Sequence, residues 1–377
     1  MPYRIILAVS AAFIGASAFW MFLPLLSISL RNDGVSDVWV GFISGLPWVG
    51  LLAMSGFIPI IIRRLGLQRM VLSGMAAAVF IFLGFAIVHD LLLSSLLCLA
   101  MGGALALRWA GMDTWVNSSF PAHLRGRLTG LYELILSGSM AVGPGILAIS
   151  GGSGRGPFVA GAAVTATAAI LLSFAGREPL HNVQQEAQPM RQRQILLHRP
   201  AAFIGIFLVG FTEAGNLSLL PVFGLSQGFS AHFSELLVTL VQSGVALGAA
   251  LIGGLSDRFS RKKLRNATIL GMVLMPLILT LDVQAGLWPW LFVWGLAQGG
   301  LFTLGIVWLE SRKTGLDLAS AMSLSMVVYT VGGIMGPPVL GFCMNFIGPK
   351  GFTSGLVFFA CLCALAIYKC RTSDAVP

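Results

Sequence analysis

The stretch VTLVQSGVALGAALIGGLSDRFSRKKLR, residues 238–265, joins a long apolar run to a strongly basic turn. Its first eighteen residues carry no charge. As a helix with a rise of 1.5 Å per residue, such a run nearly crosses about 30 Å of hydrocarbon. Five positive charges then crowd into positions 258–265, beside the single acid Asp257. This pattern predicts a membrane-spanning helix that ends in a loop exposed to water.

The composition of the whole chain agrees with that prediction. Of its 377 residues, 56% are hydrophobic and only 10% are charged, whereas soluble domains carry about 25% charged residues. The apolar runs are continuous, and a membrane β-barrel would need alternating segments of about 10 residues. The first run, 5–30, is too long for the apolar part of a signal peptide, so we expect a retained span. We therefore predict an all-α membrane protein.

Apolar runs between clusters of charge, Gly or Pro predict twelve membrane-spanning helices. In chain order they are 5–30, 38–62, 70–88, 92–117, 128–150, 157–175, 200–222, 233–256, 267–281, 286–309, 319–345 and 351–369. The third and the ninth are short, and the ninth contains Pro276.

The basic residues indicate which side of the membrane each loop occupies. If both termini are cytoplasmic, nineteen of the 23 Lys and Arg residues fall in cytoplasmic segments. Three (Arg31, Arg155 and Lys350) fall outside, and Arg108 lies within a span. This bias follows the positive-inside rule. Because the net charge of +9 is dispersed over short loops that face anionic lipid, we expect the lipid bilayer as a partner and no nucleic acid.

Two copies of a six-helix unit explain the internal resemblances of the chain. Pro24 matches Pro221, the turn at Arg63 matches the turn at Asp257, and Gly143-Pro144 matches Gly336-Pro337, all at nearly the same offset. The longest polar stretch, 176–199, separates the copies. We expect an N-terminal bundle at 1–175, a cytoplasmic linker at 176–199, and a C-terminal bundle at 200–377 that ends in a short cytoplasmic tail.

The basic turn follows the pattern G-x-x-x-D-R-x-[GS]-R-K from Gly253 to Lys262. With two six-helix halves and a basic linker, it resembles the major facilitator superfamily of secondary transporters over essentially the whole chain. The resemblance implies that Asp257 faces a helix N-terminus of the other half and latches the outward-facing state. The expected latch residues are Gly253, Asp257, Arg258, Glu310 and Arg64. In the N-terminal copy, Pro59 and Arg63 replace the Gly and the Asp. Lys262, Lys263 and Arg265 are expected mainly to anchor the loop.

Two further motifs narrow the resemblance. LSGSMAVGPGILAISGG, residues 136–152, resembles the Gly-Pro signature on the fifth helix of proton-linked antiporters. DTWVNSSFPAHLRGRLTGLYE, residues 113–133, resembles a bacterial, drug-exporter-like subgroup with unassigned substrates. Since small residues allow close helix approach and proline removes a backbone bond, we expect hinges in the fifth and eleventh helices. The hinge residues are Gly138, Gly143, Pro144, Gly336 and Pro337.

Four charged side chains inside predicted spans stand out as candidates: Arg108, Asp113, Glu133 and Glu213. Because a charge at bilayer depth costs at least about 2.5–3.5 kcal/mol, each needs a partner, a proton or a water-filled cavity. An ion pair between Arg108 and Glu133, with Asp113 alongside, would meet this need in the N-terminal half. Glu213 has no cation at its depth, which suits a group that binds and releases a proton, although a permanently neutral Glu213 bonded to Asn216 or Gln242 is the alternative.

Polar and aromatic residues within the spans are candidates for the wall of a central cavity. They are Trp20, Trp109, Tyr132, Asn216, Gln242, Gln298 and Tyr329. Trp109 and Asp113 share one helix face at i and i+4. An aromatic ring beside an acid could hold a cationic, partly apolar ligand.

We therefore expect a monomeric transporter of the bacterial inner membrane that moves a small molecule by alternating access. Intramembrane acids indicate a proton as coupling ion, with no other cofactor, and the Gly-Pro motif favours export over uptake. A membrane-embedded lipid-modifying enzyme would need a nucleophile, a base or a metal site, and no such motif occurs in the sequence. A non-transporting sensor of the same fold is the third possibility, favoured by the altered turn at Arg63.

Overall fold

A computed structural model describes residues 2–119, 125–151, 154–176, 196–197, 199–256, 258–280, 287–309 and 318–370. These residues form thirteen helices, and no strand occurs among them. The helices are α1 (Pro2–Asn32), α2 (Asp37–Ser55), α3 (Ile58–Leu65), α4 (Leu67–Phe85), α5 (Leu91–Ser119), α6 (Arg125–Ser150), α7 (Arg155–Phe174), α9 (Pro200–Ser226), α10 (Ala231–Leu255), α11 (Arg261–Leu279), α12 (Leu287–Leu309), α13 (Leu318–Ile347) and α14 (Lys350–Cys370).

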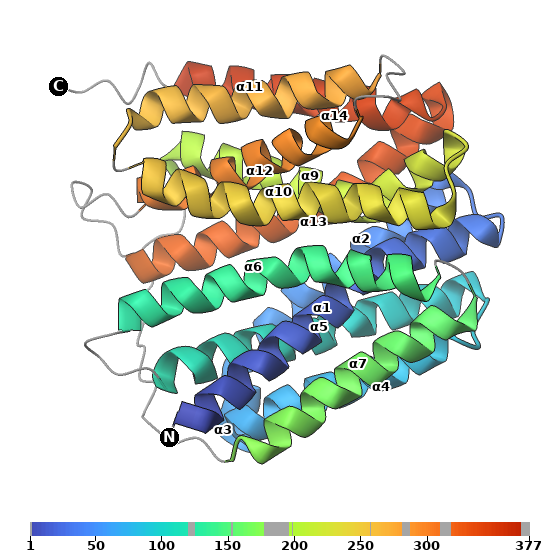
Figure 1. Cartoon of the computed structure of the whole chain (residues 1–377), viewed down its shortest axis with the longest axis vertical. Helices are drawn as coiled ribbons and strands as arrows, with labels where there is room; N and C mark the ends of the chain where they lie inside the picture. Colours follow the sequence, from blue (N-terminus) through green and yellow to red (C-terminus); the bar gives the residue numbers. More distant parts are fainter. Residues whose placement is uncertain are drawn as a thin grey trace.

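Eleven of the described helices are long and apolar enough to cross a membrane, and α3 and α11 are the two exceptions. The predicted ninth span, 267–281, corresponds to α11, which begins earlier, at Arg261. Its first turns contain the basic cluster of the quoted stretch, so its composition alone does not mark it as a span. Yet α11 packs along α12 and α14 at the edge of the bundle (Figure 1). The described residues therefore contain twelve long helices, the predicted number.

The second predicted span, 38–62, is wrong in its last third. Helix α2 ends at Ser55, and the separate helix α3 begins at Ile58, with Pro59 in its first turn. Proline is common in the first turn of a helix, because a backbone N–H there has no hydrogen-bond acceptor within the helix and proline has no N–H to leave unpaired. Arg63 and Arg64 at the end of α3 are exposed, while Ile61 and Ile62 pack against a core cluster. Helix α3 therefore has an apolar and a charged face.

The two halves of the chain repeat the same helix pairings. In the first half α1 packs on α6 and α7, α5 packs on α2 and α4, and α4 packs on α7. In the second half α9 packs on α13 and α14, α12 packs on α10 and α11, and α11 packs on α14. Each pair of the second set has its counterpart in the first. Two pseudo-symmetric six-helix halves follow from this correspondence, whereas most of the linker 176–199 lies outside the described residues.

The halves meet along α2 with α13 and α6 with α10, and α1 lies against α9 between these two seams (Figure 1). We call the face where α1 begins and α14 ends the terminal face, and the other face, where α2 and α10 begin, the opposite face. Both seams are tight towards the opposite face. A side chain at Gly41 would meet the Pro337 carbonyl, and one at Gly341 would meet the Asp37 carbonyl. The His232 Nδ1 atom lies 2.6 Å from the Ala148 carbonyl oxygen.

One basic residue of the quoted turn does more than anchor a loop. Arg261, Lys262 and Lys263 are exposed, but Arg265 is buried, and its guanidinium lies 5.2 Å from the centre of the Trp308 ring. Arg265 therefore also packs α11 on α12 through a cation–π contact.

Candidate functional site

A cavity of about 810 Å³ lies between the two halves. Its wall comes from α1, α5 and α6 on one side and from α9, α10, α12 and α13 on the other. The lining continues towards the terminal face as far as Thr129 and Met322, near the starts of α6 and α13. Because the seams are closed at the opposite face, the cavity is accessible from the terminal side.

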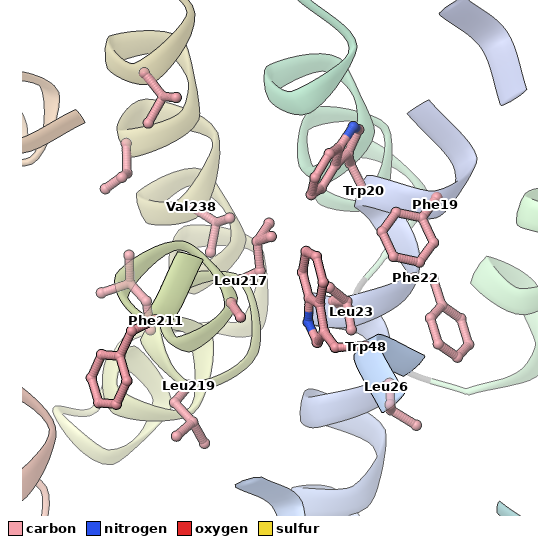
Figure 2. Close-up of a cluster of buried hydrophobic side chains, with 14 of the residues drawn as sticks. Phe19, Trp20, Phe22, Leu23, Leu26, Trp48, Phe211, Leu217, Leu219 and Val238 are labelled. Carbon is pink, nitrogen blue, oxygen red and sulfur yellow. The ribbon is translucent and has the colours of Figure 1, made fainter. Parts of the chain in front are cut away.

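An apolar plug separates the cavity from the opposite face. It consists of Trp20, Leu23, Trp48, Leu217 and Val238, which are all buried in one core cluster. Figure 2 shows Trp20, Leu23 and Trp48 from the first half facing Leu217 and Val238 from the second. Leu217 lies one turn beyond the cavity residue Glu213 on α9. The plug therefore seals the bundle through side chains of both halves.

The first half contributes a charged cluster to the cavity wall. The Tyr132 hydroxyl of α6 donates a hydrogen bond of 2.8 Å to Oδ1 of Asp113 on α5. Arg108 is only 8% exposed, and Asp113 and Tyr132 are the groups that act on it electrostatically. The charged group that acts on Glu133 is the acid Asp113, which repels an ionised Glu133. Among the described residues no ion pair joins Arg108 to Glu133, so the expected pair is wrong: the acid that acts on Arg108 is Asp113.

The Tyr132–Asp113 bond should contribute measurably to stability. We predict that Tyr132→Phe lowers the free energy of unfolding by about 1.5–3 kcal/mol, the usual contribution of a hydrogen bond to a charged group. Denaturant unfolding in detergent micelles would measure this loss. Tyr3→Phe is the matched control, because Tyr3 is 57% exposed. An equal loss in both variants would contradict the importance of this bond.

The second half contributes Glu213, which is 3% exposed and has no cation beside it among the described side chains. The Gln298 amide donates a bond of 3.4 Å to Oε2 of Glu213, and the Asn216 amide donates one of 3.2 Å to Oε1 of Gln298. The Oε1 atom of Glu213 is buried without a hydrogen-bond partner among the described residues. The site therefore holds a carboxyl group with one unpaired oxygen at the cavity wall.

Seven residues were expected at the cavity wall, and the structure places four of them there and three behind it. Trp20, Trp109, Tyr132 and Tyr329 line the cavity, as do the charged candidates Arg108, Asp113, Glu133 and Glu213. The other three do not: Asn216, Gln242 and Gln298 are at most 1% exposed between α9, α10 and α12. They form a polar layer behind Glu213. Buried polar groups are usually hydrogen-bonded, and amide side chains beside a buried carboxyl group can provide those bonds.

The expected hinge residues lie where α6 and α13 pack against neighbouring helices. A side chain at Gly143 would meet the Ser17 carbonyl of α1, and one at Gly336 would meet the Phe211 carbonyl of α9. These two glycines allow equivalent helix contacts in the two halves. A side chain at Gly138 would make only an ordinary contact, 3.7 Å from Phe13, so close approach does not require a glycine there. Helices α6 and α13 continue through Pro144 and Pro337.

Only part of the expected latch lies within the described residues. Asp257 and Glu310 fall outside them. Arg258 and Arg64 are exposed, and Gly253 lies near the end of α10. The latch thus stays a prediction.

Sequence reasoning missed several residues of the central region. Thr303, Ser137 and Ser323 add hydroxyl groups to the cavity wall, and Phe19 and Phe302 add aromatic rings. Glu235 near the start of α10 is a further buried acid, with no exposed surface. Its position inside the predicted span 233–256 was the available signal, since an acid within an apolar run demands an explanation.

Relatives of similar length share this chain's sequence at a low level. The uncharacterized MFS-type transporter YfkF of Bacillus subtilis is 25% identical over 341 residues, which cover 86% of this chain and 84% of the relative. The uncharacterized MFS-type transporter YcaD of Salmonella typhimurium is 24% identical over 354 residues, covering 91% and 88%.

Solved transporters share the fold. The nucleoside transporter NupG has a TM-score of 0.80 at 13% identity, with 100% of both chains covered. A bacterial homologue of the human lysosomal transporter Spinster, in an inward-facing and unoccupied conformation, has a TM-score of 0.76 at 14% identity, covering 100% of this chain and 99% of the other. A D-xylose–proton symporter has a TM-score of 0.76 at 13% identity, covering 97% and 96%.

The family model described as Major Facilitator Superfamily matches residues 6–234 and again residues 202–374. The two matches together take in both six-helix halves and nearly the whole chain. This chain therefore belongs to the major facilitator superfamily of transporters.

Proposed function

We propose that this transporter exports a small amphipathic molecule across the bacterial inner membrane in exchange for protons. The terminal face is then cytoplasmic, which the basic residues Arg63, Arg64, Arg261 and Lys263 at that face support through the positive-inside rule. One chain contains both halves and the whole cavity wall, so a monomer suffices. The proton is the only coupling partner that the proposal requires.

Glu213 is the observation that supports proton coupling most strongly. It is a carboxyl group at the wall of the central cavity, with one oxygen unpaired and no cation beside it. An ionised carboxylate there would have no opposite charge to balance it at bilayer depth. Binding a proton therefore removes a free-energy cost of a few kcal/mol. Water entering from the terminal face can supply or accept that proton. The group is thus suited to couple proton binding to the state of the cavity.

The cavity wall favours a ligand with an apolar body and a cationic group. Most of the lining is aliphatic or aromatic, and its charged side chains are three acids and one Arg. Trp109 and Asp113 lie side by side on α5 and offer a ring face and a carboxylate. Nucleoside and xylose transporters share the fold at 13% identity, which carries no information about this chain's substrate.

Direction and coupling can be tested in proteoliposomes of defined orientation with an imposed pH gradient. The probe is tetraphenylphosphonium, an apolar cation of the proposed class, followed with a selective electrode. We expect tetraphenylphosphonium to move from the terminal side to the side with more protons, and a protonophore to abolish this movement. Movement together with protons would reverse the proposed direction. Movement unaffected by the gradient or the protonophore would contradict proton coupling.

A further inference from the structure

Glu235 lies near the start of α10, towards the opposite face, and it is completely buried. Both of its carboxylate oxygens lack a hydrogen-bond partner within the part of the chain that the structure describes. A buried, unpaired carboxylate costs several kcal/mol more than a neutral carboxyl group. Closure around Glu235 therefore demands a proton on this side chain. The cavity mechanism described above does not use it.

The neighbours of Glu235 along α10 show which way it faces. His232, one turn before it, contacts the Ala148 carbonyl of α6. Thr239, one turn after it, is the residue that a side chain at Gly145 of α6 would approach, at 3.9 Å. Residues spaced i−3, i and i+4 share one side of a helix. Glu235 thus lies on the side of α10 that is turned towards the seam between the halves.

The same side of α10 leads from Glu235 to the cavity. Gln242, Ala246 and Ala249 follow at i+7, i+11 and i+14, so they continue one stripe along the helix. Ala246 and Ala249 line the cavity, and Gln242 lies in the polar layer behind Glu213. Val238 of the apolar plug stands between Glu235 and Gln242. Glu213 and Glu235, the buried acids described in the second half, therefore lie on opposite sides of the plug.

No described charged group compensates Glu235 from the helices packed against α10. Residues 140–150 of α6, 217–226 of α9 and 287–298 of α12 contain no titratable side chain. In α1, the nearest charged residue towards this face is Arg31, which pairs with Asp37 at 2.9 Å. His232 on α10 itself contacts a backbone carbonyl. An ionised Glu235 would thus have no nearby cation among these helix segments.

We propose that Glu235 is a second proton-binding site, which takes up a proton from the opposite side before the seam between α6 and α10 can close. When the seam opens, water reaches the carboxylate, and one of its oxygens accepts a proton. The neutral carboxyl group then allows the seam to close and the cavity to open towards the terminal face. This inference rests on the alternating-access function proposed above. It gives the inward proton gradient a direct influence on which face is open.

The test follows the distance across the opposite face by double electron–electron resonance. Spin labels at Ile149 of α6 and Ser226 of α9 report this distance, because both positions are exposed and belong to different halves. The five native cysteines are first replaced by serine or alanine. In the otherwise unchanged protein, the closed-to-open ratio should rise by up to about tenfold per unit fall in pH, since closure takes up one proton.

Variants separate Glu235 from other titrating groups. Glu235→Gln should stay closed across the pH range, and Glu235→Asp should keep a pH-dependent ratio. Asp90→Asn is the matched control, because it neutralises an exposed acid on the opposite face and should behave like the parent. A pH dependence that persists in Glu235→Gln would overturn the role of Glu235 but leave alternating access intact. A distance that never changes would instead contradict the proposed transport cycle.

Discussion

Replacing Glu213 with Gln should abolish gradient-driven transport while ligand binding survives. Glutamine has the size of a protonated glutamate and keeps a hydrogen-bonding group beside Gln298, but it cannot release a proton. Accumulation of tetraphenylphosphonium driven by a pH gradient should therefore fall at least about tenfold, towards the level of protein-free vesicles, as expected for loss of an essential intramembrane acid. Equilibrium binding of the same probe to purified protein should change much less.

A matched variant controls for the loss of one acid. Asp33→Asn removes a carboxylate at the opposite face, where Asp33 lies 3.6 Å from His89 and is 43% exposed. Transport by this variant should match the parent protein. Full proton-coupled transport by Glu213→Gln would remove Glu213 from the mechanism. The coupling role would then pass to Asp113 or Glu133, the other carboxyl groups at the cavity wall.

Replacing Gly41 with Val should prevent the opposite face from closing. A Cβ atom at Gly41 would collide with the Pro337 carbonyl and lie 3.2 Å from the Cα atom of Gly341. Both partners are backbone atoms of α13, so the helices must separate. Overpacking of this kind costs about 1–3 kcal/mol. At 1.4 kcal/mol per factor of ten, the closed-to-open ratio at this face should fall by about 5- to 150-fold.

Transport should fall with that ratio, and the spin labels at Ile149 and Ser226 should move apart. Gly56→Val is the matched control, because nothing lies within 4 Å of a Cβ atom there and the backbone is in the right-handed helical region. The control should transport at the rate of the parent. A closed opposite face in Gly41→Val would show that the seam between α2 and α13 adapts to the added volume.

The helices could be predicted because lipid requires long uncharged runs, and the repeat could be predicted because both halves keep the same turns. The break between α2 and α3 could not, since Ile58–Ile62 prolongs the apolar run and only Gly56 and Pro59 mark the interruption. The start of α11 could not be predicted either, because charged residues obscure it rather than apolar ones. Its first turns are charged and therefore resemble a loop, although Arg265 packs on Trp308.

The charged residues of the site could be predicted because a charge within a bundle must point towards a cavity or a partner. Arg108, Asp113, Glu133 and Glu213 all line the cavity. Neutral polar residues carry no such constraint. Gln242 and Gln298 fit a cavity wall or a buried layer equally well by sequence, and only the packing of α9, α10 and α12 distinguishes the two. Helix faces are equally hard to assign, because lipid and protein core are both apolar.

Alternating access is tested most directly by measuring both faces of the bundle in one protein. A second spin-label pair at Leu131 of α6 and Leu251 of α10 reports the terminal face, since both side chains are about half exposed. Alternating access predicts that the Leu131–Leu251 distance shortens whenever the Ile149–Ser226 distance lengthens, as pH or tetraphenylphosphonium is varied. Two distances that change together, or that never change, would contradict it.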